Sequence, residues 1–371
     1  MTVPFFTATR EYQNRKNEFD LAIKHVLERG DFILGNDVKE FENELASYAN
    51  ANFALGVANG SDALVLACDA LGYKNAEVIT PVLTFFASTS CIVRVGGIPK
   101  FCDVDETDFC IDVNMAGNLV NKKTRGILPV HLFSEMANMT AVKKIAAEHA
   151  LSIVEDAAEA FGMKQTFNGK KMSAGTIGDA GVYSFFPTKT LGGYGDGGAI
   201  LTNDEKIFEK VKALRVHGAM KKYHHDFVGY NSRLDTLQAA ILRVKLQKIN
   251  EAILKRKKIA DMYFEELKDV AEIILPKTKP YNDAVFYVFQ IRAKNRDALA
   301  DFLHENEIGT AIYYPVPLHL QKCFSYLGYK KGDFPVAEKL CGEVLALPIF
   351  PELTDGEVHF VCEKIKEFYK K

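Results

Sequence analysis

The fold is decided by seven short apolar runs between about residues 50 and 205: FALGVAN from Phe53, AEVITPVL from Ala76, IPKFCDV from Ile98, RGILPVHLF from Arg125, LSIVEDA from Leu151, AGVYSFF from Ala180 and GGAILT from Gly197. Helix-like segments, such as 61–72 and 136–149, lie between several of these runs. This alternation predicts an α/β domain with a doubly wound, mostly parallel sheet. Ligands of such sheets bind at the carboxyl ends of the strands.

The pattern changes after Asn203 and predicts a second, smaller α+β domain at the C-terminus. The expected elements are a long amphipathic helix near Leu234–Leu254, a helix near Lys255–Val270, a strand at Ala284–Ala293 and a helix at Asp297–Asn306. A further helix over roughly Thr9–Arg29 is expected to pack with the C-terminal domain. We therefore divide the chain into an N-terminal helix at 1–35, a large domain at 36–245 and a small domain at 246–371.

Length and composition exclude several classes of protein. The chain has 371 residues, enough for about two domains, and its 46 basic and 48 acidic residues give a net charge of −2. That balance argues against a nucleic-acid-binding face. No run approaches the roughly 18 apolar residues of a membrane span, and we expect no signal peptide. The seven cysteines include no CxxC pair, which favours buried free thiols in a reducing cytoplasm over disulfides or a metal site.

One segment combines a lysine with a cluster of glycines. Residues 184–200 read SFFPTKTLGGYGDGGAI, with Lys189 just after a strand and five glycines within Gly192–Gly198. Glycines permit tight turns and a close approach of the backbone to a ligand. A lysine held out of water or near other cations loses its proton readily and then attacks a carbonyl group. On this segment alone, a surface lysine beside a flexible loop is an equally good interpretation.

Three other strand ends carry polar or aromatic residues. VANGSDAL at 57–64 turns at Asn59-Gly60 and begins a helix at Ser61; this is either a phosphate-binding helix N-terminus or an ordinary capped helix. IVEDAAEAFG at 153–162 ends an apolar strand on Asp156, which either pairs with a cationic ring nitrogen or caps a helix. TFFAS at 84–88 places Phe85 after a strand, either stacked on an aromatic ring or packed in the core.

Together these four strand ends match the parts that hold pyridoxal 5'-phosphate. A lysine forms the Schiff base, an aspartate holds the pyridinium nitrogen, an aromatic residue covers the ring, and a helix N-terminus with hydroxyl groups binds the phosphate. The order along the chain also fits, with the phosphate turn first, then the stacking residue, the aspartate and the lysine.

The sequence closely resembles the DegT family of pyridoxal-phosphate sugar aminotransferases, which have fold type I of the aspartate aminotransferase superfamily. The resemblance covers nearly the whole chain and includes RVHG at 215–218, GYNSRLDTLQAA at 229–240 and YPVPLHLQ at 314–321. It implies that Lys189 is the catalytic Schiff-base lysine and that Asp156 is the partner of the pyridine nitrogen. It also implies that Phe85 stacks on the ring and that the phosphate is held by Gly60, Ser61 and Ser184.

The resemblance further implies a homodimer with shared active sites. Asn231 matches a residue that reaches the phosphate of the neighbouring subunit. Residues of motifs that line the sugar and diphosphate site are Tyr223, Arg233, Tyr314 and His319. No metal site is expected, because His224-His225 has no further ligand at metal spacing; the pair fits a substrate-side loop or a plain solvated loop. His131 is either a general base or a structural histidine.

Three positions depart from the family. Glu159 stands where glutamine is common, Ser134-Glu135 replaces a frequent Gly-Gln pair, and Tyr287 replaces a histidine. In relatives, the amide at the position of Glu159 donates to the phenolic oxygen of the cofactor, whereas an ionised glutamate only accepts hydrogen bonds. Glu159 is therefore expected among the cofactor-binding residues in one of three states: ionised beside the phenolic oxygen, protonated, or turned toward a cation.

The function implied by the resemblance is a ping-pong transfer of an amino group from L-glutamate to a nucleotide-linked keto-sugar. The segment around Lys189 is similar to that of members acting at C3 of the hexose. This favours a dTDP-linked 3-keto-6-deoxyhexose, with the lipopolysaccharide O-antigen as an expected destination. The alternatives are a UDP-linked 3-keto sugar and a C4 aminotransferase. A cofactor-binding regulatory protein without turnover is the alternative of a different class.

Overall fold

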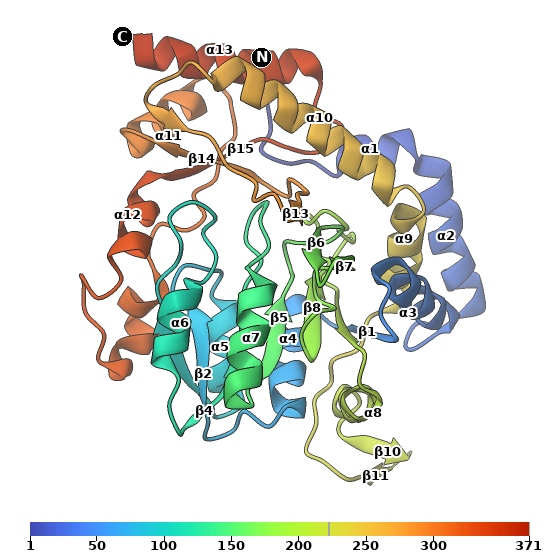
Figure 1. Ribbon diagram of the computed structural model, residues 1–371. Coiled ribbons are helices and arrows are strands. Elements are labelled where there is room, and N and C mark those ends of the chain that lie inside the picture. The colour runs from blue at the N-terminus through green and yellow to red at the C-terminus, as the bar shows by residue number, and fades with distance from the viewer. Residues whose placement is uncertain (222, 371) are drawn as a thin grey trace.

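The computed structural model describes residues 1–221 and 223–370 (Figure 1). A seven-stranded sheet forms its centre, in the order β1-β9-β8-β5-β4-β2-β3. The strands are β1 (Phe53–Val57), β2 (Glu77–Pro81), β3 (Ile98–Cys102), β4 (Thr124–Ile127), β5 (Ser152–Asp156), β8 (Ala180–Ser184) and β9 (Gly198–Thr202). Each predicted apolar run overlaps one of these strands, which confirms the doubly wound domain. In this sheet β9 runs opposite to the other six strands, which share one direction.

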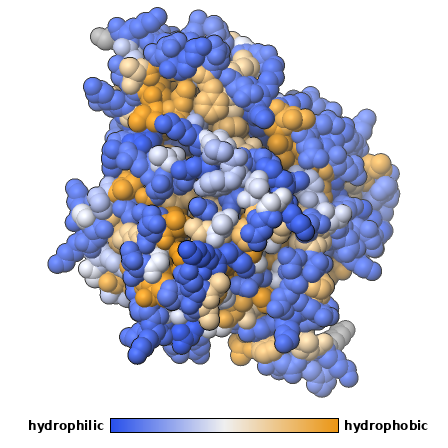
Figure 2. Space-filling model, in the orientation of Figure 1, coloured by the Kyte–Doolittle hydropathy of each residue, from blue (hydrophilic) through white to orange (hydrophobic). Residues whose placement is uncertain are grey.

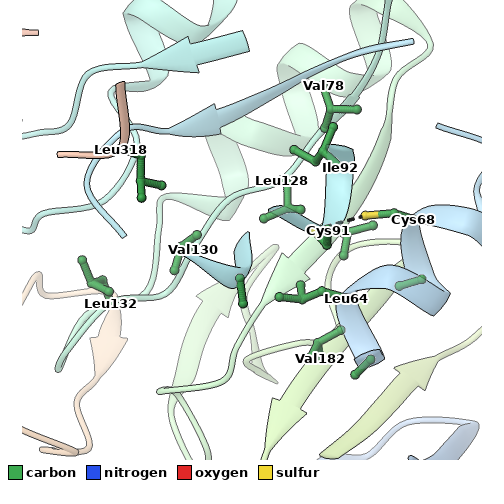
Figure 3. Packing of buried hydrophobic residues seen from close by; sticks show 14 of the residues in the cluster. Leu64, Cys68, Val78, Cys91, Ile92, Leu128, Val130, Leu132, Val182 and Leu318 are labelled. Atoms are coloured by element: carbon green, nitrogen blue, oxygen red, sulfur yellow. Dashed lines mark hydrogen bonds between the residues drawn. The ribbon is translucent and has the colours of Figure 1, made fainter. Parts of the chain in front are cut away.

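The two faces of the sheet belong to two separate apolar cores. Helices α4 (Gly60–Ala70) and α5 (Ala87–Arg94) cover one face, and α7 (Met139–His149) covers the other with α3 (Asn36–Ala49) and α9 (Thr236–Leu246). Val154 and Val182 point into the first core, part of which Figure 3 shows. Ile153 and Tyr183 point into the second. This is the period-two alternation of a strand, and burial on both faces explains the nearly continuous apolar runs.

The C-terminal region forms the predicted smaller α+β unit. Its antiparallel sheet has the order β12-β14-β15. The strands and helices of this unit are β12 (Ile273–Ile274), β14 (Phe289–Ala293), β15 (Val344–Leu347), α10 (Ile249–Leu267), α11 (Arg296–Glu305), α12 (Pro335–Glu343) and α13 (Asp355–Lys370). Figure 1 shows α10 and α13 lying across the top of this unit, above the seven-stranded sheet.

Smaller elements complete the chain. A strand pair and β13 form a third sheet: β6 (Lys164–Phe167), β7 (Lys170–Ser173) and β13 (Asn282–Asp283). A hairpin of β10 (Ala219–Lys221) and β11 (His224–His225) extends from the lower edge of the molecule in Figure 1. The remaining helices are α6 (Val113–Leu119), α8 (Glu205–Leu214) and two short 3-10 turns at Leu318–Leu320 and Lys322–Leu327.

Two predicted helices are broken where the sequence gives no signal. The first helix divides at Arg15 into α1 (Thr9–Asn14) and α2 (Lys16–Arg29). The helix expected over 234–254 ends at Leu246, and α10 begins three residues later at Ile249. Neither break contains glycine or proline. Packing sets the second break, because α9 lies against α2 and α3 while α10 lies against α13.

The N-terminal segment contacts both parts of the molecule. Val3 pairs with Ile308 of the C-terminal unit, and α2 packs on α9. Arg10 makes a bidentate ion pair with Glu357 in the first turn of α13, at 2.8 and 2.6 Å. The segment thus spans the two units, and the domain boundaries at residues 35 and 245 stay a prediction.

The Arg10–Glu357 pair predicts a pH-dependent loss of stability. The hydrogen bond from Arg10 is the main cause that lowers the pKa of Glu357 from 4.5 to about 2. Because the folded pKa lies below the unfolded one, the stabilisation is complete above pH 4.5 and is lost as the pH falls toward 2. Arg10→Ala should lower the free energy of unfolding by about 1–2 kcal/mol at pH 7, since Arg10 is partly exposed.

Urea unfolding of wild type and variant between pH 2 and 7 measures this difference. The control is Glu28→Ala, which removes an exposed Lys24–Glu28 pair on α2 and should cost under about 0.5 kcal/mol. A difference between wild type and Arg10→Ala that stays the same down to pH 2 would contradict the pairing.

Most of the face drawn in Figure 2 carries hydrophilic side chains, with apolar patches between them. In the described part of the chain, no helix is long and apolar enough to cross a bilayer. All seven cysteines are free thiols, and only Cys323 is exposed. The closest pair, Cys68 and Cys91, has its sulfur atoms 3.7 Å apart in the core of Figure 3.

Candidate active site

A cavity of about 420 Å³ lies at the carboxyl ends of β1, β2, β5 and β8. It brings together eight of the predicted site residues: Gly60, Ser61, Phe85, Asp156, Glu159, Ser184, Lys189 and Tyr314. The polar and aromatic residues that follow four different strands therefore meet in one place, as expected at the carboxyl edge of a doubly wound sheet.

Asp156 is a buried carboxylate without an ion-pair partner among the described residues. It is 4% exposed, and it accepts hydrogen bonds from Ser88 Oγ at 2.6 Å and from the amide of Ala158 at 3.1 Å. Burial raises the pKa of Asp156, although the bond from Ser88 opposes this. A buried carboxylate needs a cation or several donors. Its opening to the cavity fits a protonated ring nitrogen.

The start of α4 is shaped to receive an anion. The side chain of Asn59 caps the amide of Asp62 at 2.8 Å, while the amides of Gly60 and Ser61 have no carbonyl partner within the helix. A side chain on Gly60 would place its Cβ 2.7 Å from Cβ of Ser184. Glycine at position 60 thus lets the helix N-terminus lie directly against the end of β8, where a phosphate would meet amides and hydroxyls from both elements.

Lys189 lies at the cavity wall beside an acid. Its Nζ is 3.2 Å from Oε1 of Glu159 and 4.2 Å from the centre of the Tyr287 ring. Burial lowers the pKa of Lys189, but Glu159 and Tyr287 together outweigh burial and raise that pKa above its usual value. The lysine is therefore a protonated amine in the chain alone, and the loop after β8 aims it into the same cavity as Asp156.

Glu159 is surrounded by donors. Besides Lys189, the amide of Phe133 donates to Oε2 at 3.1 Å, and the hydroxyl of Tyr314 donates to Oε1 at 3.4 Å. Donors on both oxygens favour the ionised carboxylate. The carboxylate lines the cavity and lies 3.2 Å from the amine of Lys189, and the state that Glu159 takes beside the bound cofactor stays a prediction.

Replacing Glu159 by glutamine predicts a spectral change in the cofactor-loaded enzyme. An ionised carboxylate beside the chromophore favours its protonated form, so Glu159→Gln should lower the chromophore's pKa by about one unit or more. A spectral pH titration measures the shift. Glu135→Gln is the matched control, because Glu135 binds Asn282 and the amide of Lys279 outside the cavity. An unchanged titration alone would indicate a protonated Glu159, and an unchanged titration together with unchanged turnover would remove Glu159 from the site.

Aromatic side chains form the wall nearest the C-terminal unit. The rings of Phe85 and Tyr314 lie 6.0 Å apart, and Tyr287 and Tyr313 also line the cavity. Phe85 is 55% exposed, so the core-packing interpretation of this residue is wrong for the single chain. Tyr313 was not singled out from the sequence; its place beside Tyr314 in the motif at 314–321 was the available signal.

Three predicted residues lie on surface loops outside this cavity. Asn231 is exposed and Arg233 is partly buried, in the loop before α9. The hydroxyl of Ser232 in this loop accepts from the amide of Ala58 at 3.3 Å, which docks the loop beside the end of β1. Tyr223 is 82% exposed in the hairpin of β10 and β11. None of the three reaches the cavity of its own chain.

His319 also lies outside the cavity, and its place in the sugar site stays a prediction. It is 2% exposed, its Nε2 is 3.1 Å from Oε1 of Glu338, and its ring packs against Phe334. These partners hold the ring inside the C-terminal unit.

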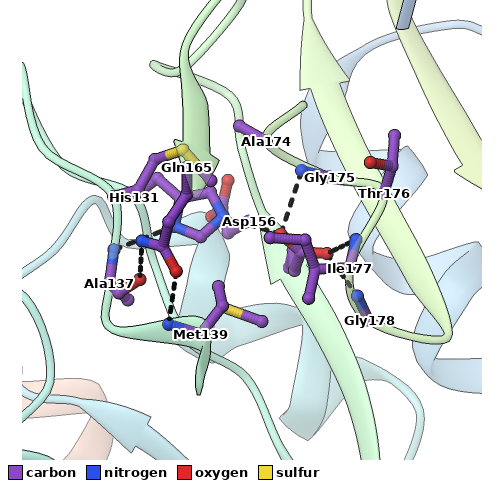
Figure 4. Close-up of polar contacts among 12 residues, drawn as sticks. His131, Ala137, Met139, Asp156, Gln165, Ala174, Gly175, Thr176, Ile177 and Gly178 are labelled. Atoms are coloured by element: carbon purple, nitrogen blue, oxygen red, sulfur yellow. Dashed lines mark hydrogen bonds and ion pairs between the residues drawn. The ribbon is translucent and has the colours of Figure 1, made fainter. Parts of the chain in front are cut away.

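His131 belongs to a buried network next to Asp156 (Figure 4). Its Nδ1 accepts from the amide of Ala137 at 3.1 Å, so Nε2 carries the proton and donates to Glu155 at 2.8 Å. Glu155 also accepts from the amides of Gly175, Ile177 and Gly178. With both ring nitrogens engaged, His131 is a structural histidine rather than a general base, and the network fixes the end of β5.

The chemistry of this donor set fits pyridoxal 5'-phosphate. An amine, a buried carboxylate, an exposed aromatic ring and an open helix N-terminus face one cavity of suitable size. Among the described residues, no group of three or more histidine, cysteine, aspartate or glutamate side chains is arranged to hold a metal ion. The sequence reasoning missed Ser88 and Thr84, although both stand in the quoted segment TFFAS.

Comparisons with known proteins agree with this geometry. The model of the DegT/DnrJ/EryC1/StrS aminotransferase family matches residues 13–366. A pleiotropic regulatory protein of Geobacillus stearothermophilus is 45% identical, covering 100% of this chain and 99% of the relative. A dTDP-3-amino-3,6-dideoxy-alpha-D-galactopyranose transaminase of Aneurinibacillus thermoaerophilus is 38% identical, covering 99% of each chain. Other relatives are named as aminotransferases of dTDP-linked or UDP-linked sugars.

A solved structure supports the same family assignment. The crystal structure of Streptomyces venezuelae DesV in complex with a ketimine intermediate has a TM-score of 0.96 to this chain, with 36% identity, and covers 100% of this chain and 99% of DesV. This agreement confirms the fold type I architecture and the dependence on pyridoxal 5'-phosphate. The chain belongs to the DegT/DnrJ/EryC1/StrS aminotransferase family, whose members are pyridoxal-phosphate-dependent sugar aminotransferases.

Proposed function

We propose that this enzyme transfers an amino group from L-glutamate to the C3 keto group of a dTDP-linked 3-keto-6-deoxyhexose. The observation that carries the proposal is the cavity in which Lys189, Asp156, Phe85 and the start of α4 meet. The choice of C3 and dTDP is supported by the similarity to the transaminase of Aneurinibacillus thermoaerophilus.

The bound cofactor supplies an electron sink for the carbon that loses or gains a proton. Lys189 is placed to carry that proton, because its side chain ends in the cavity beside Glu159. Asp156 would keep the ring nitrogen protonated through a charge-assisted hydrogen bond. The amides of Gly60 and Ser61, with the hydroxyl of Ser184, would hold the phosphate.

The remaining wall of the cavity controls access to the reacting atoms. Phe85 would lie on one face of the ring, and Tyr287, Tyr313 and Tyr314 close the side nearest the C-terminal unit. Their rings exclude water from Lys189, which strengthens its contact with Glu159. Tyr314 adds a hydroxyl at 3.4 Å from Glu159, so it would help to orient this carboxylate.

A second copy of the chain is proposed to complete the site. Asn231 and Arg233 lie in the loop before α9 and Tyr223 lies in the hairpin of β10 and β11, outside the cavity of their own chain. Exposed phenylalanines at and near the cavity, Phe85, Phe86 and Phe186, would be covered by such a partner. This arrangement supports a homodimer with shared sites. The free thiols support a reducing, cytoplasmic location.

The test uses purified enzyme in its amino form and single-turnover conditions. We expect a dTDP-linked 3-keto-6-deoxyhexose to gain an amino group, detected by mass, with the position assigned by NMR. Turnover only with a UDP-linked 3-keto sugar, or amination at C4, would replace the substrate assignment. L-glutamate should restore the amino form faster than other amino acids.

The name of the relative from Geobacillus stearothermophilus is the observation that favours a regulatory protein as a second candidate. Under that alternative the cofactor binds, but no keto-sugar of either nucleotide class is aminated in the single-turnover test. Any aminated product would exclude it.

A further inference from the structure

Two buried hydroxyls connect the cavity wall to Asp156. Ser88 Oγ lies 2.6 Å from Oδ2 of Asp156, and Thr84 Oγ1 lies 2.9 Å from Ser88 Oγ. Ser88 is fully buried and Thr84 is 2% exposed. Thr84 lies between β2 and α5 and Ser88 lies in the first turn of α5, so a second strand end reaches the carboxylate at the end of β5.

The direction of the hydrogen bonds follows from the number of protons. A carboxylate only accepts, so Ser88 donates its single hydroxyl proton to Asp156. The oxygen of Ser88 then accepts, which makes Thr84 the donor in the second bond. The chain therefore runs from Thr84 through Ser88 to Asp156, and each bond strengthens the next.

We propose that Thr84 and Ser88 are positioning residues that fix the Asp156 carboxylate and limit its affinity for protons. The proton shared between Asp156 and the ring nitrogen then stays on nitrogen, where it supports the electron sink. The inference rests on the proposed role of Asp156 as the partner of that nitrogen.

The surroundings of Asp156 show why such a limit is needed. Burial favours the neutral acid and raises the pKa of Asp156, and the nearby Glu159 carboxylate acts in the same direction. The hydrogen bonds from Ser88 and Ala158 and the charge of Lys189 act against it. The thiol of Cys91 and the phenol of Tyr314 also face Asp156, and burial holds both in their neutral forms. Without Ser88, a neutral Asp156 beside an unprotonated ring becomes more favourable.

The neighbouring Thr89 provides a matched control. It lies on the same helix as Ser88, α5, and is fully buried, and its Oγ1 has no hydrogen-bond partner within residues 1–221 and 223–370. Thr89→Val therefore removes a buried hydroxyl at nearly the same place without touching Asp156. If the hydroxyls in α5 had a purely structural role, Ser88→Ala and Thr89→Val should change the ring-nitrogen signal and the Kd for the cofactor equally.

The experiment measures the ring nitrogen directly, by NMR of the enzyme loaded with ¹⁵N-labelled pyridoxal 5'-phosphate. In Ser88→Ala the signal should move toward that of an unprotonated ring, and the Kd of the apoenzyme for the cofactor should rise about tenfold, the scale of one charge-assisted hydrogen bond. Thr84→Val should change the nitrogen signal and the Kd in the same directions as Ser88→Ala, but by smaller amounts. Ser88→Thr should restore the wild-type signal, and kcat should fall in Ser88→Ala with little change in KM.

An unchanged nitrogen signal in Ser88→Ala, or an equal shift in Thr89→Val, overturns the proposal. If Ser88→Ala does not fold, an unchanged nitrogen signal in Thr84→Val overturns the proposal instead. Neither NMR nor cofactor binding requires a sugar, so this result is independent of the substrate test. A wild-type enzyme whose ring nitrogen does not contact Asp156 would overturn the role of Asp156 together with the inference.

Discussion

Replacing Lys189 by alanine should lower kcat by at least about 10⁴-fold, because the variant loses both the nucleophile and the proton carrier. The cofactor should still bind, without a covalent link, since Asp156, Phe85 and the start of α4 remain in place. Absorption spectra and mass spectrometry of the loaded protein measure the link, and single-turnover kinetics measure the loss of activity.

The control is Lys206→Ala, which removes an exposed lysine in the first turn of α8 and should leave kcat unchanged. Borohydride reduction of wild type should place the cofactor on the peptide that contains Lys189. A label on a different lysine would show that the cavity at the carboxyl ends of the strands is not the reacting site.

Mixing two inactive variants should restore about a quarter of wild-type activity if active sites are shared. Lys189→Ala removes the amine, and Asn231→Asp places a negative charge where the partner's phosphate is expected. In an equal mixture about half of the dimers are hybrids, and each hybrid holds one site with both good residues. Activity after subunit exchange, followed by native mass spectrometry, measures the recovery.

The matched control mixes Lys189→Ala with Lys189→Ala that carries a different tag. This mixture exchanges subunits in the same way but cannot form an intact site. Suppose that exchange is complete and the mixture of Lys189→Ala with Asn231→Asp stays inactive. Each active site then uses Asn231 of its own chain or does not use Asn231. Full activity of Asn231→Asp alone would contradict the role of the loop before α9.

The large domain was predictable from the sequence because its strands are buried on both faces. Burial on both sides requires nearly continuous apolar runs, and each of the seven runs overlaps a strand of the sheet. The end of a helix inside a bundle leaves a weaker signal. The division between α9 and α10 depends on which helices lie beside them, and residues 247–248 do not encode it.

In the active site, too, some features were predictable from the sequence and others were not. Residues that follow strand ends, such as Asp156 and Lys189, were placed correctly in one cavity by their positions in the sheet pattern. The contact of Lys189 with Glu159 and the bond from Ser88 to Asp156 join different strand ends. Such contacts depend on tertiary distances, which a linear pattern does not contain.

The antiparallel direction of β9 has a consequence for the motion of the reacting amine. Ser184 and Gly198 are paired across β8 and β9, so residues 185–197 form a loop whose two ends are fastened to each other. Little freedom remains for the backbone of a short, closed loop. The movement of the amine during the reaction therefore comes from rotations within the Lys189 side chain, while the backbone at residue 189 stays fixed.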